Sequence, residues 1–437
     1  MDTQIIDRYI EDILAQSAPD RPLWNIEKIR QGKVNGWNYI DGCMMMGLLE
    51  LHAITGREDF AEFAGRYVDY YVAEDGALRG YREEEYNLDN ICEGRVLFDL
   101  YKMTGKEKYR LAEDKLFAQL QHQPRTFEGS FWHKKIYPDQ VWLDGLFMAQ
   151  VFYARYLCER GAELRARAAG PAAGLADRAE GLTDPAEGFA DITRQFKTVR
   201  VRMFDEASGL YRHGYDASHR AFWAGEDGCS KNPWLRSLGW FCLALIDVLS
   251  YAGVTAGGAA VQAANAGEGQ AADGREGTAA GAADSVTAAR KELTATLTEL
   301  AQEIARNLLR YIDPESGMLF QVPDRIGAEG NYPETSGSAM IACFFLKGAR
   351  LGILDAACAE KGRAIFEAIC DRYLTKTDDG LTLGGICLVA GLGPEENRRR
   401  DGSYEYYISE PVVENDAKGL GPFLLCYTEI LRLQAEK

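Results

Sequence analysis

The chain has 437 residues, a formal net charge of −17 and 46% hydrophobic residues, which is enough for a sizeable core. The acidic balance argues against nucleic acid as a partner, because nucleic-acid binding needs a basic surface. No apolar run reaches the length of about 18 residues that crosses a membrane, and residues 1–8 lack the segments of a secretory signal, so we expect a cytoplasmic protein without a membrane partner.

Paired helices repeat in the first part of the chain. The stretch from Leu48 to Phe60 returns as Leu97 to Tyr109. Each copy has an apolar helix, a glycine stop at Gly56 or Gly105, and a second helix that starts with charged residues. A period of about 50 residues built from two helices is typical of an α-hairpin array.

Later segments keep this alternation of apolar and amphipathic helices. Further apolar helices are expected at residues 146–157, 240–251, 339–354 and 420–433. Amphipathic helices are expected at residues 2–16, 59–73, 106–121, 192–203, 286–311 and 356–373. The pattern predicts an all-α fold, an (α/α)6 barrel of six inner and six outer helices, as one catalytic domain over residues 1–437.

Two stretches break the helical rhythm. Residues at about 162–188 and 253–289 are rich in Ala, Gly and small polar residues. We expect them to be low-complexity surface insertions on the face away from the polar clusters described next. Short β-hairpins are expected near residues 209–216 and 317–321.

Polar and aromatic clusters precede the apolar helices. They lie at residues 37–42, 88–90, 141–145, 234–240, 334–338 and 414–419, each where a loop passes into a helix. If the inner helices run parallel around one axis, all these clusters meet at one end of it. The sequence therefore predicts a pocket that holds carboxylates, an arginine and tryptophans.

Asp144 is the first candidate catalytic residue, because Trp142, Leu143 and the apolar residues after Gly145 surround it. Burial raises the pKa of a carboxyl group, which a general acid requires at neutral pH. Asp89 occupies the corresponding position one repeat earlier. Enzymes that hydrolyse or hydrate sugars commonly use two carboxylates in different surroundings. The alternative for both residues is a structural helix N-cap.

The same end of the predicted barrel supplies candidates for substrate binding. Arg236 has the planar donors that suit a carboxylate, and His213, His133 and Lys134 lie in polar stretches. The cations could instead pair with acids of the protein. The tryptophans of the clusters could stack on a sugar ring or only pack the core. The remaining candidates are Tyr39, Trp142, Trp234, Trp240, Thr335 and Ser336.

Metal and cofactor motifs are missing from the sequence. HExxH, P-loop, GxGxxG and GxSxG patterns are absent. We therefore expect no metal and no cofactor, with the chemistry carried by side chains and water. Most of the 10 cysteines lie in apolar runs and none forms a CxxC pair, which predicts buried free thiols.

These motifs together resemble the unsaturated rhamnogalacturonyl hydrolases of glycoside hydrolase family 105, and more distantly the unsaturated glucuronyl hydrolases. The resemblance covers the chain outside the two insertions, and WLDG at 142–145 and SEPVVENDAKG at 409–419 are its most specific stretches. Tyr215 and the RSLGW stretch at 236–240 depart from the family pattern, which leaves the aglycone preference open. The other matching stretches are residues 131–134, 137–150, 213–216, 234–240, 334–340 and 406–408.

The resemblance implies a reaction and roles for these residues. The family removes a 4,5-unsaturated uronic acid from the non-reducing end of short, lyase-derived oligosaccharides by hydrating the enol ether. In this scheme Asp144 protonates C4 and helps water to add at C5, Asp89 holds the sugar hydroxyls or assists the water, and His213 and Arg236 orient the substrate. The expected partner is an anionic, disaccharide-sized unsaturated oligosaccharide, with a galacturonyl-type sugar preferred, and the protein is expected to be a monomer or homodimer.

Other functions stay open at this point. A sugar 2-epimerase on the same barrel would need histidines on several inner helices. A hydrolase of saturated glycosides would need two carboxylates around the anomeric centre, and a non-catalytic carbohydrate-binding barrel would need no buried acid. An unsaturated glucuronyl hydrolase would act on another polysaccharide's fragments, since the two uronic acids differ only at C4, which is planar in the unsaturated sugar.

Overall fold

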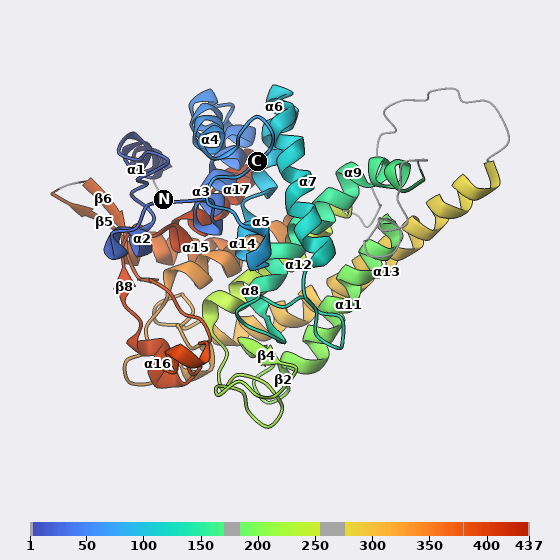
Figure 1. Cartoon of the computed structure of the whole chain (residues 1–437). Coiled ribbons are helices and arrows are strands. Elements are labelled where there is room, and N and C mark those ends of the chain that lie inside the picture. Colours follow the sequence, from blue (N-terminus) through green and yellow to red (C-terminus); the bar gives the residue numbers. More distant parts are fainter. Residues whose placement is uncertain (1–2, 170–183, 254–275, 379, 436–437) are drawn as a thin grey trace.

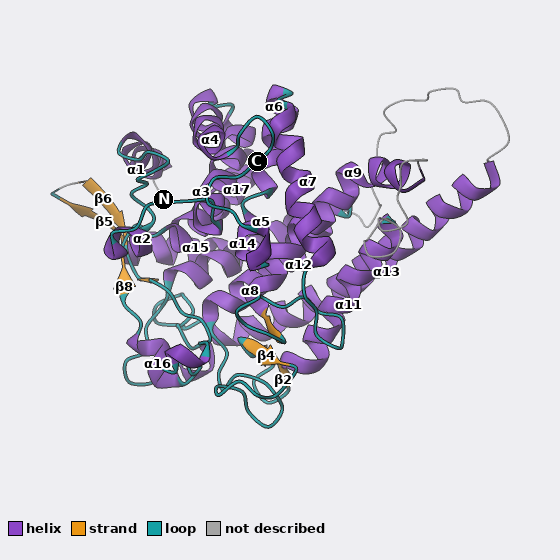
Figure 2. Ribbon diagram, viewed as in Figure 1, coloured by secondary structure: helices purple, strands orange, loops and turns teal. Residues whose placement is uncertain are grey.

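Two series of helices alternate along the chain, one forming an inner ring and the other an outer layer (Figure 1). The computed structural model describes residues 3–169, 184–253, 276–378 and 380–435. Helices dominate these residues, and only short strands interrupt them (Figure 2). The predicted (α/α)6 barrel is confirmed.

The inner helices close into a ring. α3 packs against α17 and against α5 and α6, η2 packs against α5 and α12, and α14 packs against both α12 and α17. In α12 every residue from Leu235 to Leu249 is buried, as expected for a helix surrounded on all sides. The inner segments are α3 (Tyr39–Thr55), α5 (Asp89–Cys92) with α6 (Arg95–Thr104), α8 (Leu143–Gly145) with the π-helical turn η2 (Leu146–Gln150) and α9 (Val151–Ala169), α12 (Leu235–Tyr251), α14 (Thr335–Arg350) and α17 (Ala417–Ala435).

The outer helices cover this ring. They are α1 (Thr3–Ala15), α4 (Glu58–Tyr71), α7 (Glu107–His122), α11 (Pro185–Met203), α13 (Glu276–Leu308) and α15 (Ala357–Tyr373). α11 and α13 begin earlier than the sequence pattern predicts, and α13 extends beyond the ring (Figure 1). Of the two predicted insertions, residues 170–183 and 254–275 lie outside the described residues.

Local sequence signals fix several helix ends. Asn38 precedes α3, and its side-chain oxygen accepts from the backbone N–H groups of Ile40 and Asp41. Gly56 and Gly105 end α3 and α6 in the left-handed conformation, with φ of 69° and 68°, so both predicted glycine stops are confirmed. In each case the glycine N–H donates to the last helical turn, which satisfies one of its open carbonyls.

Short antiparallel strand pairs lie in the loops. They pair as β1 with β4, β2 with β3, β5 with β6 and β7 with β8. The predicted hairpin at 209–216 is wrong in its pairing, because β4 pairs with β1 and β3 pairs with β2. Residues 317–321 form only an isolated bridge between Phe320 and Pro333 instead of the predicted hairpin. The strands are β1 (Gln140–Trp142), β2 (Phe204–Asp205), β3 (Leu210–Tyr211), β4 (Gly214–Asp216), β5 (Leu374–Thr377), β6 (Gly380–Leu383), β7 (Ile386–Cys387) and β8 (Val412–Val413).

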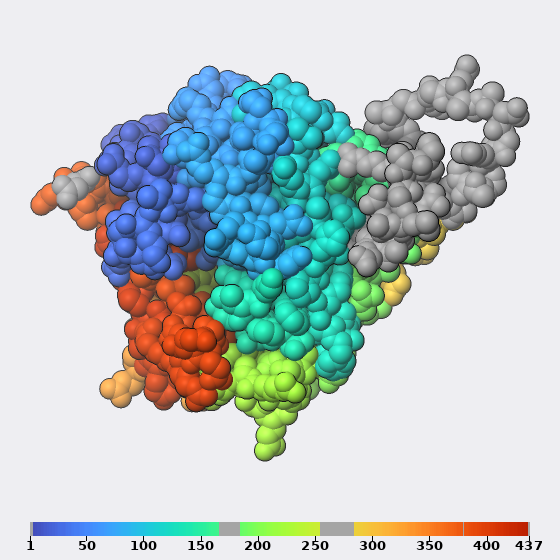
Figure 3. All heavy atoms as spheres, viewed as in Figure 1, coloured from blue at the N-terminus to red at the C-terminus, as the bar shows by residue number. Residues whose placement is uncertain are grey.

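Loop helices complete the described chain. They are the α-helices α2 (Ile26–Gln31) and α16 (Tyr404–Ser409) and the 3-10 turns η1 (Glu83–Glu85), η3 (Leu309–Tyr311), η4 (Pro323–Arg325) and η5 (Glu395–Asn397). Residues from the N-terminal third and from the C-terminal quarter adjoin on one face, in blue and red in the space-filling view (Figure 3). All ten cysteines are described and carry free thiols. Among the described helices, none combines the length and apolarity required to cross a membrane.

Candidate active site

Asp144 lies at the start of an inner helix, where the β1–β4 pair brings two distant motifs together. Trp142 is the register partner of Gly214, so Asp144 and His213 become neighbours. The Nε2 atom of His213 lies 3.3 Å from Oδ2 of Asp144. The π-helical turn η2 follows directly, and such wide turns are frequent at functional sites.

Two glycines allow this close packing. A Cβ atom at Gly145 would lie 3.2 Å from Nδ1 of His133, and one at Gly214 would lie 3.2 Å from Cδ1 of Trp142. Both distances are tighter than ordinary contacts. The glycines of the WLDG and HGYD stretches therefore let the His133 and Trp142 rings approach the backbone beside Asp144.

Asp89 is paired with a cation and faces a histidine. Nζ of Lys134 donates to Oδ2 of Asp89 at 2.5 Å, and Nε2 of His133 lies 3.5 Å from Oδ1. Neither Asp89 nor Asp144 provides a side-chain hydrogen bond that caps its helix, so the N-cap alternative is wrong for both. The side chains of Asp89 and Asp144 are 15% and 14% exposed, so part of each side chain is accessible from the surface.

The charge state of Asp144 differs from the expectation. Burial raises the pKa of its carboxyl, but the contact with His213 and the nearby His133 ring lower it below its usual value. Burial lowers the pKa of His133 to about 4, so this ring is neutral at neutral pH. The sequence argument for a raised Asp144 pKa is therefore wrong for the substrate-free protein, because it omitted the histidine that the β1–β4 pair places beside the carboxylate.

Tyr407 contacts His213, and no local sequence pattern predicts this contact. Its hydroxyl lies 2.8 Å from Nδ1 of His213, and both side chains are fully buried. Burial raises the pKa of Tyr407 well above its usual value, so the phenol keeps its proton. Because Nε2 of His213 faces an ionised carboxylate, we infer that the Nε2 atom carries the ring hydrogen and that Tyr407 donates to Nδ1.

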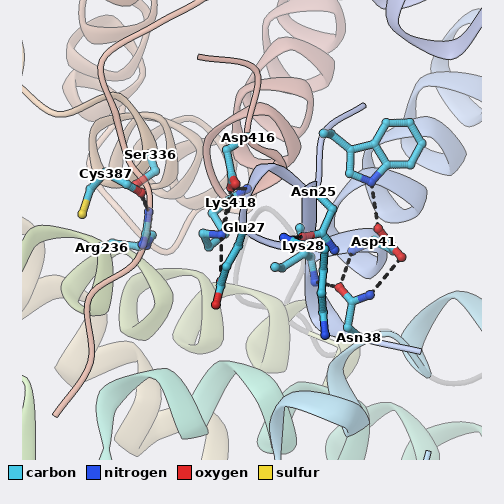
Figure 4. A network of polar contacts seen from close by, with 12 residues as sticks. Asn25, Glu27, Lys28, Asn38, Asp41, Arg236, Ser336, Cys387, Asp416 and Lys418 are labelled. Atoms are coloured by element: carbon cyan, nitrogen blue, oxygen red, sulfur yellow. Dashed lines mark hydrogen bonds and ion pairs between the residues drawn. The ribbon is translucent and has the colours of Figure 1, made fainter. Parts of the chain in front are cut away.

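Arg236 is held by protein groups on the other side of the site. Its Nη1 donates to the carbonyl of Cys387 at 2.5 Å and to the hydroxyl of Ser336 at 3.3 Å (Figure 4). Thr335 donates to the carbonyl of Gly384 at 2.7 Å, and Glu334 caps α14. Thr335 and Ser336 are fully buried, so both hydroxyls serve to hold the loop and Arg236.

A second ion-pair group lies near Tyr39. Nζ of Lys418 is 3.1 Å from Oδ1 of Asp416 and 3.7 Å from Oε2 of Glu27, and it lies between them in Figure 4. The charges of Asp89, Glu27 and Asp416 all act on Tyr39, whose pKa burial raises well above its usual value. Glu27, on the short helix α2, was missed because no local pattern distinguishes it from a solvated helix residue.

The tryptophans of the site are buried. Trp142 stacks against the rings of both His133 and Tyr137, with centroids 4.4 and 4.8 Å away. Trp240 stacks on Phe147 at 4.6 Å, and Trp234 lies under the Arg236 guanidinium at 4.7 Å. Trp37, Trp142, Trp234 and Trp240 are at most 6% exposed. Their burial favours the packing alternative over sugar stacking: these rings form the walls of the site and hold its polar residues.

The described residues contain no group of three or more His, Cys, Asp or Glu side chains arranged to hold a metal ion. The polar atoms of the site are arranged for proton transfer and hydrogen bonding. Asp144 Oδ2 and His213 Nε2 face each other, yet neither forms a well-aligned hydrogen bond with any group in the described part of the chain. Both atoms are buried, so each has the other as its nearest charged or polar neighbour, and the 14% exposure of Asp144 belongs to the rest of its side chain.

Comparisons with known proteins agree with this fold and site. A sequence model of Glycosyl Hydrolase Family 88 matches residues 15–166 and 172–434. The structure of a family 105 glycoside hydrolase from C. acetobutylicum is similar, with a TM-score of 0.75 and 34% identity, covering 96% of this chain and 98% of that chain.

Two relatives are similar in sequence. Protein Atu3128 of Agrobacterium fabrum is 37% identical over 246 residues, which cover 55% of this chain and 89% of the relative. The unsaturated rhamnogalacturonyl hydrolase YesR of Bacillus subtilis is 26% identical over 125 residues, which cover 27% of this chain and 34% of that protein.

Proposed function

Because the chain belongs to glycosyl hydrolase family 88, we propose that it removes a 4,5-unsaturated uronic acid from the non-reducing end of short oligosaccharides. The resemblance to family 105 is confirmed by the match to the C. acetobutylicum enzyme. The protein is thus a glycoside hydrolase, and the 2-epimerase and carbohydrate-binding alternatives lose their support. A galacturonyl-type sugar linked to rhamnose is our proposed substrate, in keeping with the name of the relative YesR.

The contact between Asp144 and His213 carries this proposal. A carboxylate and an imidazole face each other at 3.3 Å without a well-aligned hydrogen bond. Asp89, which is paired with Lys134, lies beside the neighbouring His133 ring. A sugar between these groups would find an acid or base for its double bond and acceptors for its hydroxyls. This arrangement has no need for a metal ion.

The proposed reaction adds water across C4=C5. Asp144 gives a proton to C4, and water adds to C5 as Asp144 takes a proton from it. The hemiketal at C5 then opens to a keto sugar acid and releases the aglycone. Asp144 is ionised in the free protein at neutral pH, because its pKa is lowered. The arriving uronate brings a second negative charge beside Asp144, and like charges raise the pKa of a carboxyl. Substrate binding thus raises the pKa of Asp144 and favours its protonated form.

Lys134 and Asp89 have the complementary role in this proposal. The site cations Lys134, Arg236 and Lys418 each already have a protein acceptor. Of these three, Lys134 has the most exposed side chain, at 21%, whereas Arg236 and Lys418 are 2% and 0% exposed. We therefore assign the uronate carboxylate to Lys134, while Asp89 turns to a sugar hydroxyl.

The decisive experiment follows the loss of enol-ether absorbance with unsaturated rhamnogalacturonan disaccharide for the wild type and Asp144→Asn. Asp139→Asn is the matched control, because Asp139 lies on the loop before β1 with φ of 57°, a conformation that Asn adopts readily. We expect decay with the wild type and Asp139→Asn, and none with Asp144→Asn.

Each other outcome changes the proposal. Decay with an unsaturated glucuronyl disaccharide alone would keep the reaction and replace the substrate. Decay with Asp144→Asn at the wild-type rate would remove Asp144 as the acid. If neither disaccharide reacts with folded wild-type protein, the proposed hydration is refuted.

A further inference from the structure

A second cavity lies at the opposite end of the barrel from Asp144. It has a volume of about 360 Å³ and is lined by residues from all six inner segments, including Arg95 of α6, Asp247 of α12 and Lys347 of α14. Exposed Ala53, Lys102 and Met103 lie at its edge. This volume is within the range of small-molecule sites, which begins at about 300 Å³.

The acidic groups of this cavity are already neutralised. Asp247 accepts from Nη2 of Arg95 at 2.6 Å and from Nζ of Lys347 at 2.7 Å, so both of its oxygens are used. The other lining carboxylates are also bound to cations: Glu429 to Arg350 and Arg432, Glu50 to Arg432, and Asp99 to Arg155. Each carboxylate of the lining therefore already has a cationic partner.

Hydrogen-bond donors remain in excess. Nε and Nη1 of Arg95 are buried and have no oxygen acceptor in the described chain, and the side chain is only 6% exposed. The Cys92 thiol contacts Arg95 by a hydrogen bond and feels its charge, but a thiol is at most a weak acceptor. The Lys347 ammonium has three donors and forms one side-chain hydrogen bond, to Asp247. The cavity thus offers hydrogen-bond donors that suit a ligand which accepts hydrogen bonds and carries negative charge.

The rest of the lining is apolar. Met46 and Leu49 of α3, Leu243 of α12 and Leu425 of α17 contribute carbon atoms to the cavity wall. Such a surface favours the carbon body of a ligand over a fully hydrated inorganic ion.

Aromatic rings separate this cavity from the candidate active site. The guanidinium of Arg95 lies 4.8 Å from the centroid of the Phe147 ring, and Phe147 stacks on Trp240 at 4.6 Å. Trp240 in turn meets Tyr39 edge-on at 6.3 Å. Arg95, Phe147 and Trp240 are buried and Tyr39 is partly buried, so these side chains separate a ligand in the far cavity from Asp144.

We propose that this cavity is a second binding site, for a small organic carboxylate whose anion contacts Arg95 and Lys347 and whose carbon body lies against Met46, Leu49 and Leu243. The site is independent of the reaction proposed for Asp144. The alternative is that the ion pairs only match the negative ends of the inner helices and that water fills the cavity.

Isothermal titration calorimetry with hexanoate tests the proposal, with hexanol as the uncharged probe and inorganic phosphate as an anion without a carbon body. We expect hexanoate to bind more tightly than either, in the wild type and equally in Asp144→Asn. Lys347→Met keeps the length of the side chain but removes its charge, and should weaken hexanoate binding about tenfold or more. Lys197→Met, on the outer helix α11, is the matched control and should bind as the wild type.

A second variant keeps the test independent of the buried charges. Ala53→Trp adds bulk at the exposed edge of the cavity and should abolish hexanoate binding while the protein stays folded. Equal binding of hexanoate and hexanol, or hexanoate binding that survives both Lys347→Met and Ala53→Trp, would overturn the proposal. So would the absence of measurable hexanoate binding to the wild type.

Discussion

Replacing Tyr407 by Phe tests how the site controls the His213–Asp144 pair. The substitution keeps the ring, which stacks near Trp234, and removes only the hydroxyl that lies 2.8 Å from Nδ1 of His213. Without this donor, Nδ1 is left buried and unsatisfied, and the ring can place its hydrogen on Nδ1 instead of Nε2. The Nε2 atom would then point its lone pair at the Asp144 carboxylate, and the two would repel each other.

The expected magnitude follows from one hydrogen bond. A buried neutral hydrogen bond contributes about 1 kcal/mol, and an unsatisfied partner adds about 1 kcal/mol more. If the correct tautomer is needed throughout the transition state, these energies correspond to a fall in kcat of about 5-fold to 30-fold. The KM should change less, because the side chains that contact the substrate stay in place.

The assay measures kcat and KM from the loss of enol-ether absorbance, and nitrogen NMR shifts of His213 report its tautomer. Tyr406→Phe is the matched control, because its hydroxyl accepts from the N–H of Gly391 at 3.0 Å and is equally buried, but does not contact His213. An unchanged kcat in Tyr407→Phe, or an equal fall in Tyr406→Phe, would refute the orienting role of Tyr407.

Three further predictions concern the same site. Because the pKa of Asp144 is lowered in the free protein, the acid form of Asp144 becomes ever rarer as pH rises from 5 to 7. We therefore expect kcat/KM, which reports the free enzyme, to decrease over this range, while kcat stays level to higher pH. Parallel profiles of kcat/KM and kcat would contradict a pKa that the substrate raises. Lys134→Met should raise KM about tenfold or more by removing a charge-assisted contact, and Lys135→Met, on the exposed neighbour, should leave KM unchanged. Gly145→Ala should lower kcat, because its Cβ would lie 3.2 Å from Nδ1 of His133. In contrast, Gly65→Ala in α4, where the nearest atom would be 3.9 Å away, should leave kcat unchanged and stabilise the fold by about 1 kcal/mol, as thermal unfolding can measure.

The helical frame follows closely from local sequence signals. Apolar residues at helical spacing and the glycine stops at Gly56 and Gly105 depend on a few neighbouring residues, and the structure has helices that end at both glycines. Such signals are local, because a helix satisfies its backbone hydrogen bonds within itself. The starts of α11 and α13 were less well predicted, since small residues give no hydrophobic period there.

The electrostatics of the site could not be predicted in this way. Whether Asp144 has a raised or lowered pKa depends on His213, which reaches it only through a pair of three-residue strands. Strands this short give no usable periodicity. Tyr407 likewise acts through a contact with His213 that joins residues far apart in the sequence. Burial alone predicts the wrong direction for the Asp144 pKa because one neighbouring imidazole outweighs it.

The parallel inner helices explain how an acidic protein can hold an anionic sugar. The N-termini of the inner helices face the candidate site, and each helix N-terminus favours a negative charge by about 0.3–1 kcal/mol. Asn38 caps α3 with a neutral side chain, and α12, which carries Arg236, begins without a side-chain cap. These helix ends therefore keep some of their positive potential for a ligand. The opposite ends favour cations, and there the chain has Lys102, Lys347, Arg350 and Arg432 in the last turns of α6, α14 and α17. The net charge of −17 thus does not by itself describe the site, because the N-termini of the inner helices add positive potential there.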